Sequence, residues 1–431
     1  MDRADPGAGA VAQDHPAERA VHRTGGPAAA AAALRDGTLG GVPEDLVSTA
    51  EAAALLGVRR ETVYVYVSRG LLTRISDTSR HQGSRFRRAE VLALRDRRRR
   101  PRAGVFEVAV ETTISEVTPD GRLSYRGHSL ADLLDGRGYE SVAELLWQCG
   151  RLDWTPDAVS QQAAATARQF PAAPAANRVR LAVAALGCLD PVPGDPLAPA
   201  VLASVGPRAL NAAVDAVDAV GVPTGAGSLA ERLAAALGTP DVELVNAALI
   251  CQADHELATS TIAARVAAGA RSGPYEVVAA GLAAIAGPRH GAATMLAREL
   301  LDLVLTDGIE AALERPGVGA SWRDGLPGFG HIVYRAPDPR GVVLLDLIRD
   351  RDPELAELVD RLSLTVLRER SLWANADLAL AAMEIALELA PGSTATIFGI
   401  ARIAGFLAHA AEESLYPLRF RPRASYVGPR P

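Results

Sequence analysis

The feature that most constrains this chain is a helical pattern of apolar residues that begins near Val105 and continues to the C-terminus. Long Ala, Leu and Val segments place apolar side chains three and four residues apart, the spacing of one face of an α-helix. Gly, Pro and Asp-Pro interrupt these segments as they do at helix ends. One brief extended stretch is expected near residues 108–114. The pattern predicts a mainly all-α domain of catalytic size at residues 105–431.

Length and charge predict a second, smaller domain before the helical one. A chain of 431 residues is long for one domain. Its net charge of −6 conceals a strongly basic segment at residues 59–102. No apolar run approaches the length of a membrane span, and no secretory signal is seen, so we expect a cytoplasmic protein that does not bind membranes.

Motifs for metals and nucleotides are not found. Cys149, Cys188 and Cys251 are far apart, which predicts reduced, mostly buried thiols and no metal site. Neither a GxGxxG nor a GxxxxGK phosphate loop occurs. We therefore expect no metal and no permanently bound cofactor.

The region before residue 105 divides into three parts. Residues 1–43 are rich in Ala, Gly and Pro, which predicts a disordered tail. Residues 44–98 carry the pattern of a small folded domain. Residues 99–104 form a short basic linker to the helical domain.

The pattern of the small domain is two short helices at residues 46–57 and 58–70 around a tight turn. An extended segment at residues 71–86 and a third helix at residues 89–95 follow. This order resembles the winged helix-turn-helix domain of mercury-resistance-type regulators and phage excisionases.

The resemblance implies a DNA-binding face on the second helix, which would expose Arg59, Arg60, Thr62 and Tyr64. Further guanidinium groups on the wing would neutralise phosphates, and these belong to Arg80, Arg85, Arg87 and Arg88. Small helix-turn-helix folds also serve as assembly modules, and an arginine run can be a solvated linker. Binding to DNA and a role in assembly therefore both remain open.

Three histidines of the helical domain lie in unusual local settings. They occur in Asp254-His255-Glu256, Gly287-Pro-Arg-His290-Gly291 and Pro327-Gly-Phe-Gly-His331. Glycine lets the backbone approach a ligand closely, which suits a polar site. Each imidazole taken alone also fits a buried histidine bonded to a carbonyl group.

Arginines gather in the same C-terminal third, at Arg340, Arg402 and Arg421. The forked guanidinium suits a dicarboxylate ligand. Arg402 lies in an apolar helix, where it could instead pair with a neighbour on that helix. A buried guanidinium needs a partner or an anionic ligand in either case.

These blocks recur in the same order in the citrate synthase family, and residues 105–431 resemble that family. The resemblance is weakest at residues 151–243. It implies the citrate synthase fold, with a large and a small helical domain, the small one at roughly residues 255–360. The matching blocks are residues 123–133, 254–257, 287–291, 328–340, 375–377, 400–409 and 421–428.

The resemblance implies a catalytic set of three residues. Asp377 would remove a proton from the methyl group of an acyl-CoA thioester, and His290 would stabilise the enol or enolate by a hydrogen bond to the thioester oxygen. His331 would donate to the ketone oxygen of a 2-oxo acid.

Four further residues would hold the carboxylates of the 2-oxo acid. His255, Arg340 and Arg402 would do so within one subunit, and Arg421 would act from the partner subunit of a homodimer. The implied reaction is an acyl transfer in which acetyl-CoA or propionyl-CoA condenses with oxaloacetate or a related 2-oxo acid. It would yield citrate or 2-methylcitrate and free CoA, with the CoA thioester as substrate and no resident cofactor.

Several positions depart from the usual wording of the family. Ala258 replaces an Asn, Arg289 an apolar residue, and Ile332 an Arg. These changes leave the acyl chain length open, because one methylene alters selectivity by only about 1 to 3 kcal/mol. Further departures are Ala292, Thr294 and Met295.

Two other functions remain in view. The chain could be a DNA-binding regulator whose helical domain senses a metabolite, or an enzyme whose N-terminal module only mediates assembly. Asp377 favours catalysis, since binding a dianion does not call for an added negative charge.

Overall fold

The computed structural model describes residues 46–68, 71–75, 84–99, 109–192, 197–218, 227–315 and 325–422. Packing divides the chain into two compact units, Met1–Ala109 and Val110–Pro431. The predicted tail at residues 1–43, nearly all of the predicted linker at 99–104, and Arg80 lie outside the described residues.

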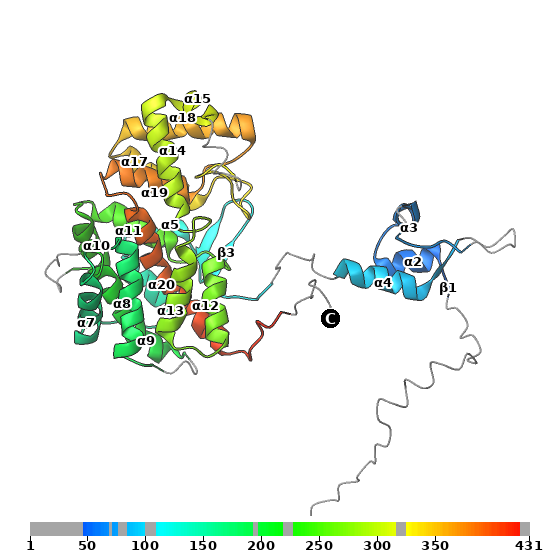
Figure 1. Cartoon of the computed structure of the whole chain (residues 1–431), viewed down its shortest axis with the longest axis horizontal. Coiled ribbons are helices and arrows are strands. Elements are labelled where there is room, and N and C mark those ends of the chain that lie inside the picture. Colours follow the sequence, from blue (N-terminus) through cyan, green and yellow to red (C-terminus); the bar gives the residue numbers. More distant parts are fainter. Residues whose placement is uncertain are drawn as a thin grey trace, which may run out of the picture. The chain divides into compact units, whose positions relative to one another are not determined.

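The smaller unit packs three helices beside a two-stranded antiparallel sheet (Figure 1). Ser48 caps the first helix, and its side chain and that of Glu51 form a reciprocal capping box. Gly57, with φ of 63°, ends this helix in the left-handed conformation. A core that includes Val63, Phe86 and Val91 joins the elements. The elements are β1 (Leu46–Ser48), α2 (Thr49–Leu56), α3 (Arg60–Ser68), β2 (Arg85–Arg87) and α4 (Arg88–Arg99).

The prediction of three helices and an extended return segment is confirmed for this unit, with shifted boundaries. Leu46 and Val47 do not begin the first helix but form β1, because they pair with Arg87 and Phe86 of β2. The third helix is longer than predicted. Most of the predicted wing, at residues 76–83, lies outside the described residues.

The larger unit begins with a three-stranded antiparallel sheet in the order β3-β4-β5. The single extended stretch predicted at residues 108–114 is therefore wrong in place and number. Ser115 and Val117 are buried while Glu116 between them is exposed, and this alternation lies beyond the predicted end at residue 114. The strands are β3 (Ser115–Val117), β4 (Leu123–Tyr125) and β5 (His128–Ser129).

Helices form the rest of the larger unit, which confirms the prediction of a mainly all-α domain. Their bounds are α5 (Leu130–Leu134), α6 (Tyr139–Trp147), α7 (Ala158–Arg168), α8 (Ala175–Leu189), α9 (Pro199–Asp215), α10 (Leu229–Leu237), α11 (Val242–Gln252), α12 (Thr259–Gly269), α13 (Pro274–Ile285), α14 (Ala293–Asp307), α15 (Ile309–Glu314), α17 (Pro339–Arg349), α18 (Pro353–Arg370), α19 (Ala376–Ala386) and α20 (Ser393–Ser414).

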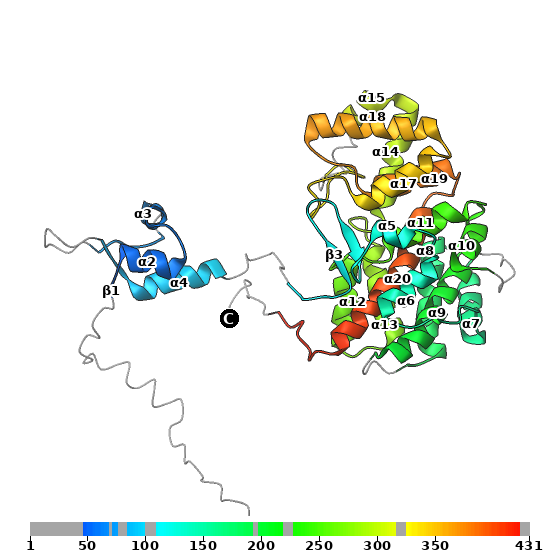
Figure 2. The same ribbon diagram turned by 180° about the vertical axis from the view of Figure 1, so that it is seen from behind.

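The 22-residue helix α20 lies at the centre of this unit, surrounded by α6, α8, α12 and α13 (Figures 1 and 2). Close packing requires Gly281, because a Cβ atom there would overlap the Phe406 ring. Contrary to the expectation that no run is long enough, α20 has the length and hydropathy of a membrane span. The fold buries 89% of that apolar window, as expected for a core helix.

A second group of helices, α14, α15, α17, α18 and α19, packs together at one end of the unit (Figure 2). This group covers residues 293–386 and so differs from the range of 255–360 predicted for a small subdomain. The group begins later than predicted because α12 and α13, at residues 259–285, pack on α20 and belong to the helices that surround it.

Candidate active site

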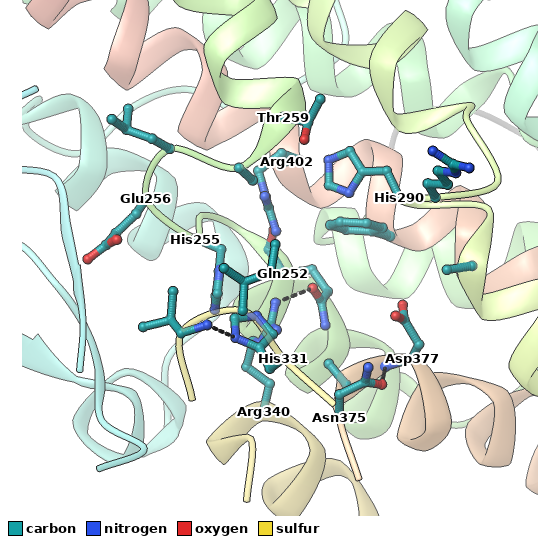
Figure 3. Close-up of a pocket in the computed structure, with 18 of the residues that line it drawn as sticks. Gln252, His255, Glu256, Thr259, His290, His331, Arg340, Asn375, Asp377 and Arg402 are labelled. Carbon is teal, nitrogen blue, oxygen red and sulfur yellow. Dashed lines mark hydrogen bonds between the residues drawn. The ribbon is translucent and has the colours of Figure 1, made fainter. Parts of the chain in front are cut away.

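A cavity of about 500 Å³ lies where the two helix groups meet. It is lined by the end of α11, the turn between α13 and α14, the starts of α12, α17 and α19, and the first half of α20. Six of the seven residues predicted to act on substrates line it, although they come from segments far apart in the sequence (Figure 3). They are His255, His290, His331, Arg340, Asp377 and Arg402.

Arg421 is the predicted residue that the structure does not bring to this cavity. It is exposed on the segment that follows α20, and its backbone N–H donates to the carbonyl oxygen of Arg419 at 3.0 Å. Its predicted role belongs to a partner subunit, so it stays a prediction.

His290 lies in the turn between α13 and α14. Its Nε2 is 2.6 Å from the Ser260 hydroxyl oxygen, and its ring packs edge-on against Phe398. The following Gly291 is required, because a Cβ atom there would overlap Ile285. Burial, and then the charges of Arg402 and Arg340, lower the pKa of His290 to about 4. The imidazole is therefore neutral at pH 7.

His331 has its tautomer fixed by the backbone. Its Nδ1 accepts hydrogen bonds from the N–H groups of Val333 at 3.1 Å and Tyr334 at 3.2 Å. Burial and the charge of Arg340 lower the pKa of His331 to about 4. A neutral imidazole carries one N–H, so the proton is on Nε2, which can donate to a ligand.

Asp377 lies in the first turn of α19. The cap residue Asn375 accepts from the backbone N–H of Asp377 at 2.9 Å and donates to the carbonyl oxygen of Gly330 at 3.0 Å. Burial raises the pKa of the Asp377 carboxyl to about 6, although the charge of Arg340 opposes the rise. At pH 7 the group is mostly ionised and is a stronger base than an ordinary aspartate.

Two arginines, Arg340 and Arg402, and the neutral His255 line the cavity together with Asp377. Burial and the nearby arginines lower the pKa of His255 well below its usual value, and its Nε2 is 3.0 Å from the Tyr334 hydroxyl oxygen. Arg340 pairs with Asp338 at 2.7 Å and also donates to the Gln252 side chain at 3.2 Å.

Arg402 differs from Arg340 because it has no acidic partner within bonding distance among the described residues. Its Nε donates to the backbone oxygen of Gln252 at 2.7 Å, and its Cζ lies 4.8 Å from the centre of the Phe398 ring. Nη1 and Nη2 are buried and have no hydrogen-bond partner in the described part of the chain. Such a guanidinium calls for an anionic ligand.

The three most notable departures from the family pattern all line the cavity: Ala258, Arg289 and Ile332. Ile332 is 92% exposed beside His331, and Arg289 is exposed beside His290. Ala292 and Met295 instead line a second cavity, and Thr294 is buried. Three of the departures therefore alter the lining of the cavity, and none replaces a residue predicted to be catalytic or to bind a carboxylate.

Sequence reasoning gave no role to several residues that hold these groups in place. Ser260 and Tyr334 contact the histidines, and Asp338 pairs with Arg340 and accepts from the backbone N–H of Ala376. Proximity to a motif was the available signal for these three. Gln252, at the end of an apolar helix, carried none.

The predicted DNA-binding residues are only partly on one face. Arg59, Arg60 and Tyr64 are exposed, whereas Thr62 is half-buried. Thr62 follows Arg60 by two residues, which is about 200° around a helix, so it faces away from Arg60 and Tyr64. The prediction that Thr62 shares their exposed face is wrong.

The thiol prediction also needs correction, because Cys188 is exposed, Cys149 is partly buried and only Cys251 is buried.

Two family models match the chain, one in each unit. The model described as citrate synthase, C-terminal domain, matches residues 105–423. The model described as helix-turn-helix domain matches residues 46–99.

Curated relatives match in part. Citrate synthase 2 of Bacillus subtilis is 33% identical over 196 residues, which are 44% of this chain and 52% of that protein. Citrate synthase of Saccharolobus solfataricus is 33% identical over 203 residues, which are 44% of this chain and 53% of that protein. The matched region thus spans about half the length of these relatives.

Solved structures confirm the fold of the larger unit. Citrate synthase of Thermoplasma acidophilum, in a ternary complex with carboxymethyl coenzyme A and oxaloacetate, gives a TM-score of 0.66 at 24% identity, covering 77% of this chain and 97% of that one. Citrate synthase of Thermotoga maritima gives a TM-score of 0.62 at 22% identity, covering 74% and 93% of the two chains.

Proposed function

The chain belongs to the citrate synthase family, and from this premise we propose that it condenses acetyl-CoA or propionyl-CoA with oxaloacetate. The products would be citrate or 2-methylcitrate and free CoA. One observation carries the proposal: a single cavity is lined by a carboxylate of raised pKa, two neutral histidines and a buried guanidinium with unpaired donors.

The first step is the removal of a proton from the thioester methyl group by Asp377. A carboxylate alone is too weak a base for this carbon acid, so the negative charge that develops on the thioester oxygen needs a donor already in place. His290 supplies it. If the Ser260 hydroxyl donates to Nε2, the proton of the neutral ring is on Nδ1, which then donates to the thioester oxygen.

In the second step the enol carbon attacks the ketone carbon of oxaloacetate. The Nε2–H of His331 donates to the ketone oxygen and protonates it as the new carbon–carbon bond forms. Water then hydrolyses the thioester, which releases CoA and makes the reaction effectively irreversible.

The carboxylates of oxaloacetate are bound by His255, Arg340 and Arg402, with Arg421 supplied by the partner subunit of a homodimer. The unpaired Nη1 and Nη2 of Arg402 support this assignment for one carboxylate. The predicted dimer and the cytoplasmic location are part of the proposal.

A panel assay of thiol release tests the proposal. Acetyl-CoA and propionyl-CoA are each combined with oxaloacetate, 2-oxoglutarate and pyruvate, and free thiol is measured with time. We expect release with oxaloacetate and at least one acyl-CoA. No release with any pair, from folded protein that binds oxaloacetate, would overturn the enzymatic proposal.

The helix-turn-helix match favours a second candidate function, in which the chain is a DNA-binding regulator and the cavity senses a metabolite. Exposed Arg59 and Arg60 support contact with phosphates. The two candidates differ in their response to Asp377→Asn, which removes catalysis but leaves binding of DNA and of a dicarboxylate intact. A third reading, assembly through the N-terminal unit, predicts that the oligomeric state changes when α3 is altered.

A further inference from the structure

A network of buried polar residues lies outside the cavity and takes no part in the proposed reaction. Asp254, Arg265, His409 and Glu413 are each 0% exposed, and none lines the cavity. They belong to α12, α20 and the turn after α11, and α12 and α20 lie side by side in both views (Figures 1 and 2). Buried charges are costly unless paired, so an arrangement of this kind calls for an explanation.

His409 is the centre of this network. Its Nδ1 is 2.6 Å from Nη1 of Arg265, and its Nε2 is 3.3 Å from Oδ2 of Asp254. A guanidinium can only donate, so Nδ1 accepts and Nε2 carries the proton that is donated to Asp254. His409 thus links a buried cation to a buried carboxylate.

Asp254 in turn shapes the turn that presents His255 to the cavity. Its Oδ2 accepts from the backbone N–H of Glu256 at 3.1 Å and from the Ser115 hydroxyl at 2.5 Å. Glu256 has a positive φ of 49°, so this turn is not one that a non-glycine residue adopts without support. His255 lies between the two residues that the carboxylate joins.

The other end of the network reaches the segment that follows α20. Arg265 donates from Nε to Glu413 at 3.0 Å, and Arg419 donates from Nε to the same carboxylate at 2.8 Å. Arg419 precedes Arg421 by two residues. One network therefore connects the turn of His255 with the segment that carries Arg421. Arg421 is the residue predicted to bind a carboxylate in the partner subunit.

We propose that His409 is a positioning residue for oxaloacetate, acting through Asp254 on the turn that holds His255. This inference rests on the proposed function of the cavity. It predicts a selective effect, because His255 faces the oxo-acid carboxylates, whereas His290 and Asp377 act on the acyl-CoA. Loss of the network should therefore weaken oxaloacetate binding and leave acyl-CoA binding nearly unchanged.

The test compares three variants of the full chain. His409→Phe removes both hydrogen bonds, and His409→Gln restores one acceptor and one donor. Phe406→Leu is the matched control, since Phe406 is fully buried three residues earlier in α20 and makes no polar contact. Should His409→Phe fail to fold, Ser115→Ala removes a different hydrogen bond to the same carboxylate and should act in the same direction more weakly.

We expect His409→Phe to raise the KM for oxaloacetate about tenfold or more and the KM for acetyl-CoA less than about twofold, with partial rescue by His409→Gln. Hydrogen exchange of residues 253–258 should accelerate in His409→Phe and not in Phe406→Leu. Equal changes in both KM values, or the same exchange in all variants, would overturn the inference.

The readouts separate this inference from the proposed function. If the wild-type protein releases no thiol, calorimetric binding of oxaloacetate and the exchange rates still report on His409. An unchanged affinity for oxaloacetate together with unchanged exchange in His409→Phe would then reject the positioning role, whatever the outcome of the thiol assay.

Discussion

Arg402 is tied to Gln252 by one hydrogen bond, from its Nε to the backbone oxygen at 2.7 Å, and this bond leaves Nη1 and Nη2 buried without a hydrogen-bond partner among the described residues. Burial lowers the pKa of Arg402 to about 10, because its charge is poorly solvated. The site is thus prepared for an anion at a cost to the unliganded protein.

Arg402→Met should therefore separate stability from binding. We expect the unliganded variant to melt at the same temperature as wild type or higher, because it removes an unsatisfied buried charge. The KM for oxaloacetate should rise about 100-fold, since charged hydrogen bonds are lost. Melting without oxaloacetate measures the stability effect, the thermal shift on adding oxaloacetate measures binding, and initial rates of thiol release give the KM. Arg349→Met, on the surface, is the control, and a variant at Arg402 that still responds to oxaloacetate would contradict this prediction.

The pH dependence should report the Asp377 carboxyl. Because the base must be ionised, activity should rise with pH through about 6 and fall about tenfold per unit below it. His290 and His331, with pKa values of about 4, should add no step between pH 5 and 8. The measurement is kcat/KM for thiol release from pH 4.5 to 8.5, because this ratio reports the pKa of the free enzyme. An acid limb below pH 5 would show that burial does not raise this pKa.

Asp377→Asn should abolish turnover while the substrate still binds. The amide cannot accept the methyl proton, so kcat should fall about 1000-fold, within the range for loss of a general base. Calorimetry should give an affinity for oxaloacetate within about threefold of wild type, because His255, Arg340 and Arg402 are unchanged. Asp346→Asn, a change on an exposed residue paired with Arg349, serves as the control. Turnover near the wild-type rate would remove Asp377 from the mechanism.

Ser260→Ala should lower kcat about tenfold with little change in the KM for oxaloacetate. The hydroxyl, 2.6 Å from Nε2, orients the His290 ring, and such supporting contacts are worth about 10- to 100-fold. Ser414→Ala is a matched control, since Ser414 is also buried and donates to the carbonyl oxygen of Ala411 away from the cavity. Equal kinetics for the two variants would argue against this role.

Binding to DNA should depend on the exposed arginines at the start of α3. Arg59→Ala with Arg60→Ala should weaken binding to a 30-base-pair duplex of mixed sequence and reduce the salt slope by about 2. Thr62→Ala should have little effect, because its side chain is half-buried on the far side of the helix. Fluorescence anisotropy at several salt concentrations measures both. Wild-type protein that fails to bind at low salt would favour the assembly role of this unit.

The local sequence pattern was sufficient to predict a feature wherever the interaction that forms it joins residues close in sequence. Ser48 and Glu51 form the predicted start of a helix because the two side chains are only three residues apart. The six residues that line the cavity were found from short blocks that include glycines such as Gly291, which no larger residue could replace without overlap. The place of β3 was missed, since its alternation of buried and exposed residues depends on partners across the sheet.

The sequence alone determined the helical class, the two-part organisation and six residues that line the cavity, because these depend on periodicity and short motifs. Only the tertiary structure decided the pKa values of those residues. The raised pKa of Asp377 and the lowered pKa of His290 come from burial, which arises only when distant helices pack. Likewise, His409 meets Asp254 across 155 residues of sequence, a contact that no local pattern specifies.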